Sequence, residues 1–273
     1  VLTSWLQGGE EGGAVVADLG GSVVTGINGN PISLLAAQIN APLHMVGGDA
    51  PLHHPDGSVV DAAVDEQMRD AFDDLLGLCN QAVDALGPDS DRLSLGQVLW
   101  TLWRGSELAA RGDPTLESVF AWYVANLEFA NASTLEKVSL TEWDQDDEYE
   151  LQGSHALVSG GNVRLVEGLA EGLDIMFNTV VERISYSRSS VTIRTTAGQT
   201  LTADAALVTV PLGILKRDLI TFDPPLPPAK RDTIQRIGFG VLNKVVMLFP
   251  RAFWGSVDMI GRLVQPGTAR GLL

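Results

Sequence analysis

Residues 15–25 read VVADLGGSVVT, a short apolar run, two adjacent glycines with a serine, and a second β-branched run. The two runs predict short strands at Val15–Leu19 and Val23–Thr25, and the Gly20–Ser22 link predicts a turn. Adjacent glycines after a strand let a backbone approach a flat ligand closely. The alternative is a plain turn, which is the commoner use of a glycine pair. The stretch therefore predicts strand, turn and strand, with ligand binding left open.

A second stretch, residues 238–249, reads GFGVLNKVVMLF. From Asn243 onward its β-branched and apolar residues predict a strand. Alternation would place Lys244, Val246 and Leu248 on one face of that strand. A lysine on an apolar face loses water unless a cavity or a partner receives it, so Lys244 is a candidate tuned amine or an anchor for an ordered water. The alternative is an edge-strand lysine that snorkels to solvent.

The rest of the chain predicts helices and strands in a mixed α and β class. Apolar residues spaced three and four apart predict an amphipathic helix over Glu66–Leu86. Its predicted buried stripe consists of Met68, Phe72, Leu75, Leu76, Cys79 and Val83. Further helices are predicted near Ile32–Ile39, Leu95–Ala110, Thr115–Ala130, within Gly160–Gly172 and at about Ala229–Arg236. Strands are predicted at Asp174–Asn178, Val191–Thr196, Thr200–Ala203 and Ala205–Val210, and Pro51–Asp61 is predicted to be a loop.

Composition and charge exclude several classes of protein. The formal net charge of −16 argues against direct binding of nucleic acid by this chain, and it is compatible with a basic partner or simply with solubility. Cys79 is the single cysteine, which excludes an intramolecular disulfide and fits a reducing compartment. No apolar run approaches the roughly 18 residues of a membrane span. No signal peptide is visible. The four histidines are scattered, so no metal site is predicted.

Two polar motifs are candidates for binding. Residues 122–132 read WYVANLEFANA, with Asn126 and Asn131 five apart near a predicted helix end. Two amides so close together indicate either a role in polar contacts or helix capping. Residues 143–150 read WDQDDEYE, where carboxylates lie beside aromatics. Such a cluster attracts Lys and Arg side chains, and the alternative is a solvated acidic loop.

Five motifs together resemble the lysine-specific histone demethylases of the flavin amine oxidase superfamily, in the right order along nearly the whole chain. They are 18–26 (DLGGSVVTG), 125–132 (ANLEFANA), 143–147 (WDQDD), 210–216 (VPLGILK) and 238–244 (GFGVLNK). The stretches 246–250 (VMLFP) and 253–255 (FWG) are most similar to the plant and green-algal branch. The 210–216 motif and the Lys244 motif are shared with polyamine and monoamine oxidases, whereas 125–132 and 143–147 are more specific to the demethylases.

The resemblance implies an α/β fold in two interleaved parts. One part is a Rossmann-type FAD-binding domain, which would include residues 1–25 and 155–215. The other is a substrate domain with a mixed sheet and helices, which would include residues 26–154 and 216–273. The family's dinucleotide signature would precede Val1 and its closing flavin segment would follow Leu273. The absence of Met at position 1 also indicates a fragment, and we expect such a fragment to hold FAD poorly by itself.

The resemblance also implies roles for individual residues. Lys244 matches the lysine that holds a water against the flavin ring. The positions that match flavin contacts are Ser22, Val23, Thr25, Val181, Thr209, Val210 and Pro211. The positions that match the lining of the substrate cleft are Asn126, Ala130, Asn131, Asp144, Asp146, Asp147 and His155.

The activity implied by the resemblance is oxidative demethylation of mono- and dimethyl-lysine on a histone tail, in the nucleus. The methyl carbon gives a hydride to FAD, and the iminium is hydrolysed to amine and formaldehyde. Oxygen then reoxidises the flavin and yields hydrogen peroxide. A chromatin corepressor complex is an implied partner. In the animal nuclear enzyme a long coiled coil docks the corepressor in the interval that corresponds to Leu95–Trp122, and this interval is too short for one.

Two alternatives remain open from the sequence. A polyamine oxidase would share the chemistry and differ in substrate, since a polyamine needs a narrow tunnel and a peptide needs a wide acidic cleft. A non-catalytic protein that only binds a basic tail would use the acidic motif without bound flavin.

Overall fold

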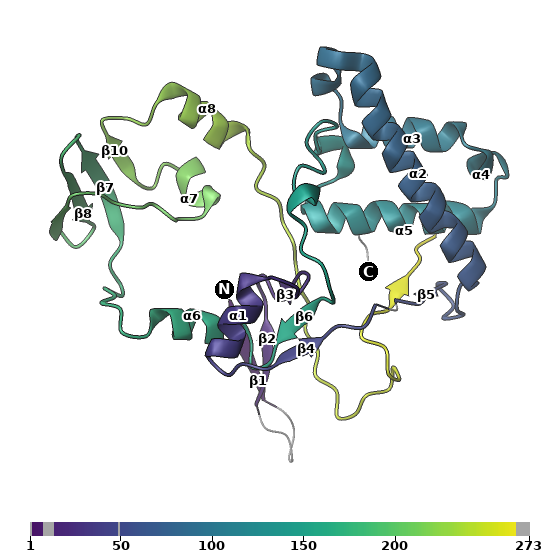
Figure 1. The fold of residues 1–273 in the computed structure, drawn as a ribbon, viewed down its shortest axis with the longest axis horizontal. Coiled ribbons are helices and arrows are strands. Elements are labelled where there is room, and N and C mark those ends of the chain that lie inside the picture. The colour runs from purple at the N-terminus through teal and green to yellow at the C-terminus, as the bar shows by residue number, and fades with distance from the viewer. Residues whose placement is uncertain (1, 8–13, 49, 266–273) are drawn as a thin grey trace. The chain divides into compact units, whose positions relative to one another are not determined.

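The computed structural model describes residues 2–7, 14–48 and 50–265 (Figure 1). The chain divides into two compact units. The first consists of Val1–Leu169 with Val241–Leu273, and the second consists of Ala170–Gly240. The assignment of functional domains implied by the resemblance stays a prediction, because each unit is defined by its own packing and not by a ligand.

Part of the first unit is a small layer of strands with helices. Its strands are β1 (Thr3–Gln7), β2 (Ala14–Asp18), β3 (Val23–Val24), β4 (Leu43–Met45) and β6 (Ala156–Val158). β1 and β2 pair antiparallel, and β6 lies between β3 and β4 with both pairings antiparallel. The helices of this layer are α1 (Pro31–Gln38) and α6 (Val163–Ala170). Asn30 caps α1, because its side chain accepts from the N–H of Ile32 and Pro31 is tolerated in the first turn.

The other part of the first unit is a cluster of helices around an apolar core. The helices are α2 (Ala62–Leu86), α3 (Leu95–Gly105), α4 (Glu107–Ala110) and α5 (Pro114–Asn131), with short 3-10 turns at Gly87–Arg92, Leu135–Lys137 and Asp147–Tyr149. Two short strands, β5 (Leu52–His53) and β11 (Gly261–Arg262), pair parallel beside them. Phe120 is fully buried and stacks on Trp103, with 4.1 Å between ring centroids. Burial of each such aromatic side chain contributes about 1.5–3 kcal/mol.

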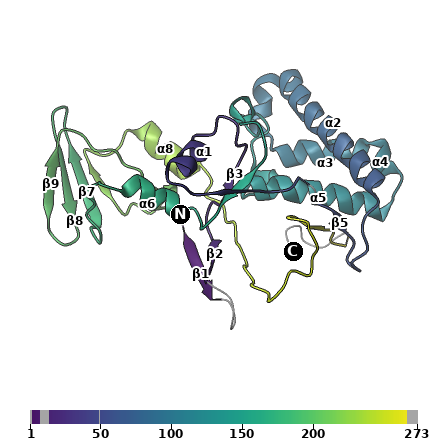
Figure 2. The same cartoon turned by 60° about the horizontal axis from the view of Figure 1, so that its bottom comes forward.

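The second unit is built on a four-stranded mixed sheet. Its strands are β7 (Val181–Tyr186), β8 (Val191–Thr195), β9 (Thr200–Ala203) and β10 (Thr221–Asp223), in the order β10-β7-β8-β9. β10 runs parallel to β7 and the other pairs are antiparallel, as Figure 2 shows for β7, β8 and β9. Two helices belong to this unit, α7 (Leu212–Lys216) and α8 (Pro228–Arg236). A small core of Ile184, Val191 and Ile220 holds the sheet.

The predicted helices are confirmed, except that the one predicted over Leu95–Ala110 is interrupted at Ser106 and forms α3 and α4. The predicted buried stripe of α2 is also confirmed. Met68, Phe72, Leu75 and Cys79 are buried, and Leu76 and Val83 pack against the same core. The predicted strands at Val191–Thr196 and Thr200–Ala203 are confirmed as β8 and β9. The loop predicted at Pro51–Asp61 was partly wrong, because β5 lies within it.

Three predicted strands were wrong: Asp174–Asn178, Ala205–Val210 and the run from Asn243. Each is apolar, yet none of these residues pairs with a strand in the described part of the chain. A strand needs a hydrogen-bonded neighbour for its backbone, so apolar and β-branched content alone does not make one. Leu207 is 89% exposed and Val245 is 86% exposed, so these side chains do not stand on a buried sheet face.

Among the described residues, no helix combines the length and the apolar content that crossing a membrane requires. The same residues contain no cluster of three or more His, Cys, Asp and Glu side chains placed to hold a metal ion.

Candidate functional site

The side chain of Lys244 lies on the turn that follows β2. Its Nζ donates to the carbonyl oxygen of Gly20 at 2.6 Å, to Ser22 Oγ at 2.8 Å and to the carbonyl oxygen of Asp18 at 3.1 Å. Lys244 is partly buried, whereas its neighbours from residue 241 to residue 250 are exposed. Lys244 therefore does not stand on a strand face, and its side chain is anchored to the turn from a segment without regular secondary structure. These three oxygen atoms replace water as hydrogen-bond acceptors for the ammonium, as expected for a lysine that is partly buried.

The strand after this turn presents alternate residues to solvent. Val24 is buried in the core of the small layer, whereas Val23 is 51% exposed and Thr25 is exposed. Successive residues of a strand point to opposite faces, so this pattern is typical of a half-buried strand. Ser22, Val23, Thr25 and Lys244 thus lie together in the first unit, and their roles toward a flavin stay predictions.

The residues after β3 are held against the segment that leads into β6. The N–H of Gly26 donates to Nδ1 of His155 at 3.0 Å, so this ring nitrogen is the acceptor. Gly26 has a φ of 67° and no Cβ, and a Cβ here would run into the carbonyl of Leu151. His155 is therefore brought next to Thr25, which joins one residue predicted to line the substrate cleft to the predicted flavin contacts.

The end of α5 carries three of the predicted substrate positions. Asn126, Ala130 and Asn131 are all exposed, and Asn126 and Ala130 share a face because they are four residues apart. Asn131 donates through Nδ2 to the carbonyl of Leu127 at 3.0 Å, so its amide caps its own helix. The helix ends at Asn131, and the C-cap residue Ala132 has a left-handed φ of 47°. Capping accounts for Asn131, and the role of Asn126 in substrate binding stays a prediction.

The acidic motif folds into a loop beside α2. Asn80 of α2 donates to Oδ2 of Asp144 at 2.9 Å and accepts from Trp143 Nε1 at 3.0 Å, which fixes the start of the loop. Asp146 and Asp147 are exposed. Lost hydration, followed by the negative charges of Asp144, Asp146 and Glu150, raises the pKa of Asp147 above the usual aspartate value. A bound cation would reduce the repulsion among carboxylates that lie so close together.

The remaining predicted flavin contacts lie in the second unit. Val181 begins β7, and Val210 packs against the core of that unit. Thr209 is exposed, and Pro211 caps the start of α7. These four residues are described within their own unit, so their part in a shared flavin site stays a prediction.

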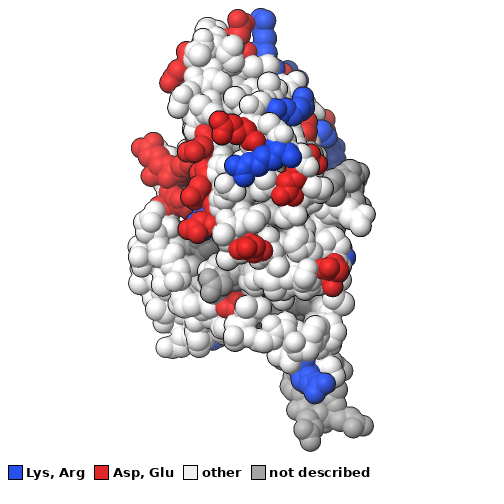
Figure 3. All heavy atoms as spheres, turned by 90° about the vertical axis from the view of Figure 1, so that its right-hand side faces the viewer, with Lys and Arg blue, Asp and Glu red and all other residues white. Residues whose placement is uncertain are grey.

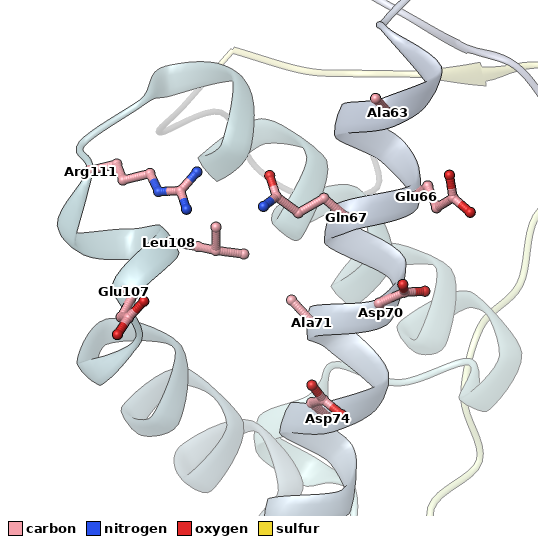
Figure 4. A pocket seen from close by; sticks show the side chains of 9 residues that line it. All are labelled: Ala63, Glu66, Gln67, Asp70, Ala71, Asp74, Glu107, Leu108 and Arg111. Carbon is pink, nitrogen blue, oxygen red and sulfur yellow. The ribbon is translucent and has the colours of Figure 1, made fainter.

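A groove between α2 and α4 does not coincide with any predicted site residue (Figure 4). It is lined by Ala63, Glu66, Gln67, Asp70, Ala71, Asp74, Glu107, Leu108 and Arg111. Figure 3 shows that carboxylates gather in patches on the face of the molecule drawn there, with fewer basic side chains. The groove is open and mostly acidic at its rim, and we assign no ligand to it.

The turn from Gly20 to Ser22 fits the edge of a flat polar ligand. A Cβ built on Gly21 would meet nothing within 4 Å, so the backbone there is accessible. The N–H groups of Gly21 and Ser22 donate to no other described residue. Free N–H groups beside an exposed glycine are suited to the acceptor atoms of a flavin ring, so the residues present are compatible with that cofactor.

Sequence reasoning did not find Asn162, which lies on the same turn. Its Nδ2 donates to the carbonyl of Gly21 at 2.7 Å, and its backbone N–H donates to Oδ2 of Asp18 at 2.9 Å. The signal available in the sequence was the pair Gly160 and Gly161 directly before a helix, because such a pair permits close approach of backbones.

The chain is similar to known proteins of one flavin-containing family. The family model described as "Flavin containing amine oxidoreductase" matches residues 3–271. "Lysine-specific histone demethylase 1 homolog 3" from Oryza sativa subsp. japonica is 42% identical over 272 residues, which is 99% of this chain and 33% of that protein. "Lysine-specific histone demethylase 1 homolog 1" from Arabidopsis thaliana is 43% identical over 274 residues, which is 99% of this chain and 32% of that protein. The chain thus spans about a third of the length of these curated relatives.

A solved structure of putrescine oxidase bound to putrescine has a similar fold. Its TM-score is 0.54 at 18% sequence identity, and the match covers 81% of this chain and 52% of that chain. This likeness shows the α/β amine oxidase fold, and the family match covers nearly the whole chain. The chain therefore belongs to the flavin-containing amine oxidoreductases, a family whose cofactor is FAD.

Proposed function

We propose that this chain is part of the catalytic region of an FAD-dependent demethylase that oxidises mono- and dimethyl-lysine on a histone tail. The observation that carries the proposal is the contact of Lys244 with Ser22 across 222 residues of sequence, at 2.8 Å. It joins the residue predicted to be catalytic to a residue predicted to contact the flavin. The names of the similar plant proteins support the substrate class.

The residues that would contact the flavin are the positions that match the family's contacts, namely Ser22, Val23, Thr25, Val181, Thr209, Val210 and Pro211. When bound, FAD supplies the two-electron oxidation of the carbon–hydrogen bond next to the amine nitrogen, and the protein supplies orientation and electric field. Exposed Val23 and Thr25 offer a side-chain surface, and the N–H groups of Gly21 and Ser22 offer donors. A quaternary amine has no nitrogen lone pair to form an iminium, so trimethyl-lysine should be refused.

Lys244 would hold a water close to the reacting carbon. An ammonium has three donors, and here they go to Asp18, Gly20 and Ser22. The bond to Asp18 is the longest, at 3.1 Å, so we infer that this donor turns to the water while the other two keep the amine in place. The ammonium then stabilises negative charge that develops nearby, which is the use of a fixed cation in a site with little water.

The acidic loop would receive the cationic side chains of the tail. Asp144 is oriented by Asn80, and Asp146 and Asp147 remain open to solvent. Lost hydration and then the neighbouring carboxylates raise the pKa of Asp147, so a Lys or Arg side chain that binds there offsets the repulsion and gains an ion pair. The formal net charge of −16 would further steer a basic tail toward the protein. A nuclear location and a chromatin corepressor complex belong to this proposal.

The test uses the full-length protein, purified with its flavin. A dimethyl-lysine histone peptide is incubated with it, and mass spectrometry reads the loss of methyl groups while formaldehyde is measured in parallel. Demethylation of the dimethyl peptide, with none of the trimethyl peptide, supports the proposal. Oxidation of spermine or putrescine but not of the peptide would replace it with a polyamine oxidase. Binding of the peptide by a protein that holds no flavin would replace it with a non-catalytic reader of basic tails.

A further inference from the structure

The glycine turn is held by polar contacts from three distant segments. The N–H of Leu19 donates to the carbonyl of Leu2, and the side chain of Asp18 accepts from Thr3. Lys244 reaches the turn from one part of the sequence and Asn162 from another. The proposed function assigns a role to Lys244, and it does not account for the contact of Asn162 with the turn.

Asn162 and Lys244 hold successive peptide units of the turn. Lys244 holds the carbonyl of Gly20, and Asn162 holds the carbonyl of Gly21. Neither peptide bond is cis, so each carbonyl points opposite to the N–H of the next residue. The Lys244 contact therefore directs the N–H of Gly21 away from the amine. The Asn162 contact directs the N–H of Ser22 away from the amide in the same manner.

The approach of Asn162 to the turn is built into the backbone. Gly161, directly before it, has a φ of 83°, and a Cβ there would come within 2.6 Å of Val16 Cγ1 and within 3.1 Å of Asp18 Oδ1. Only glycine permits so close a passage across β2. The N–H of Asn162 then bonds to the carboxylate of Asp18, which places its side chain under the carbonyl of Gly21.

The side chain of Asn162 also contains a polar atom whose burial destabilises the fold. Its Oδ1 is buried and has no partner among the described residues. A buried acceptor without a partner destabilises the folded state, and an apolar side chain of the same shape would avoid the penalty. The Nδ2 contact to Gly21 is the feature that compensates for it.

We propose that Asn162 is a positioning residue that orients the Gly21–Ser22 peptide so that the N–H of Ser22 faces the flavin ring. This inference rests on the proposed function, because it assumes that FAD binds at the turn. Asn162 does not itself touch the cofactor in this account. It acts through the carbonyl of Gly21, while Lys244 acts through the carbonyl of Gly20.

The test compares three variants of the full-length protein after removal of FAD. Asn162→Leu keeps the branched shape and removes the amide. Asn162→Ser is a safer second variant, since serine is well tolerated directly before a helix and is too short to reach Gly21. Arg164→Met is the matched control. Arg164 lies two residues after Asn162, and its guanidinium donates to the carbonyls of Ser159 and Asn40. The substitution therefore removes hydrogen bonds to backbone carbonyls nearby and leaves the contacts of the glycine turn in place.

The readouts are the FAD dissociation constant, the position of the visible flavin bands, and kcat and KM for the dimethyl peptide. We expect both Asn162 variants to weaken FAD binding about tenfold, on the scale of one lost orienting hydrogen bond, and to shift the flavin bands. The thermal midpoint of the flavin-free protein should stay near that of the parent, and KM for the peptide should not change. Arg164→Met should leave FAD binding and the bands unchanged.

Parent-like FAD binding and flavin bands in both Asn162 variants would overturn the inference alone. Equal weakening by Arg164→Met would also overturn it, because the effect would then come from the start of α6 in general. A parent protein that holds no FAD would overturn the proposed function, and the inference would fall with it.

Discussion

Replacement of Lys244 by methionine tests the centre of the proposed site. Methionine keeps the length and the apolar stem, and it removes the ammonium with all three donors. A hydrogen bond that involves a charged group contributes about 1.5–3 kcal/mol. The three bonds share one partly buried ammonium, and water replaces part of what is lost. We therefore expect the substitution to reduce the free energy that stabilises the turn by about 2–3 kcal/mol, which is less than the sum of three independent hydrogen bonds.

The consequence for catalysis should be larger than the consequence for folding. The helical core around Phe120 does not involve Lys244, so the fold should survive. Much of the predicted flavin contact lies at Val181 and from Thr209 to Pro211, so FAD should still bind. Loss of a positioned polar group near developing charge lowers the rate by about a hundredfold or more. The Lys244→Met enzyme should therefore be yellow, folded and slow.

The assay is demethylation of a dimethyl-lysine peptide by the full-length protein, read by mass spectrometry at matched flavin content. Lys216→Met is the control, because its Nζ also donates to a backbone carbonyl, that of Gln235 at 2.8 Å, within the second unit. The control should retain the parent rate. If Lys244→Met with full flavin content demethylated the peptide at nearly the parent rate, Lys244 would be excluded from the active site.

Four further predictions concern the acidic loop, the core cysteine and the chain by itself. Replacement of Asp146 and Asp147 by Asn should raise KM for the peptide with little change in kcat, and the effect should shrink as salt rises; an unchanged KM at low salt would mark the loop as a solvated surface. Because the pKa of Asp147 is raised, its charge disappears at a higher pH than for an ordinary aspartate, so peptide affinity should begin to fall early on acidification. Isothermal titration should show a flatter pH profile for Asp147→Asn, and identical profiles would contradict this. Burial raises the pKa of Cys79 to about 11, so alkylation followed by mass spectrometry should leave it unmodified in the native protein and label it after unfolding; fast native labelling would refute its place in the core. Residues 1–273 purified alone should be colourless and poorly soluble, in line with the exposed apolar side chains between Val241 and Trp254, and stoichiometric yellow flavin in that preparation would show the expectation wrong.

The sequence by itself determined the local elements whose causes are local. The spacing of Met68, Phe72, Leu75 and Cys79 defined the buried face of α2, because helical periodicity depends only on neighbours along the chain. The same holds for the glycine turn after β2, where backbone freedom is a property of the residue type. The motifs also sufficed to indicate the family that the comparison then showed.

Only the tertiary structure decided which apolar runs become strands and which polar groups meet. The run after Asn243 has strand composition, but a strand depends on a partner that composition does not specify, and its residues pair with none in the described chain. The contacts of Lys244 and Asn162 with the turn span from 141 to 226 residues of sequence. Such contacts depend on how distant segments pack, and no local pattern encodes them. The polar partners of Lys244 were therefore visible only once the chain was folded.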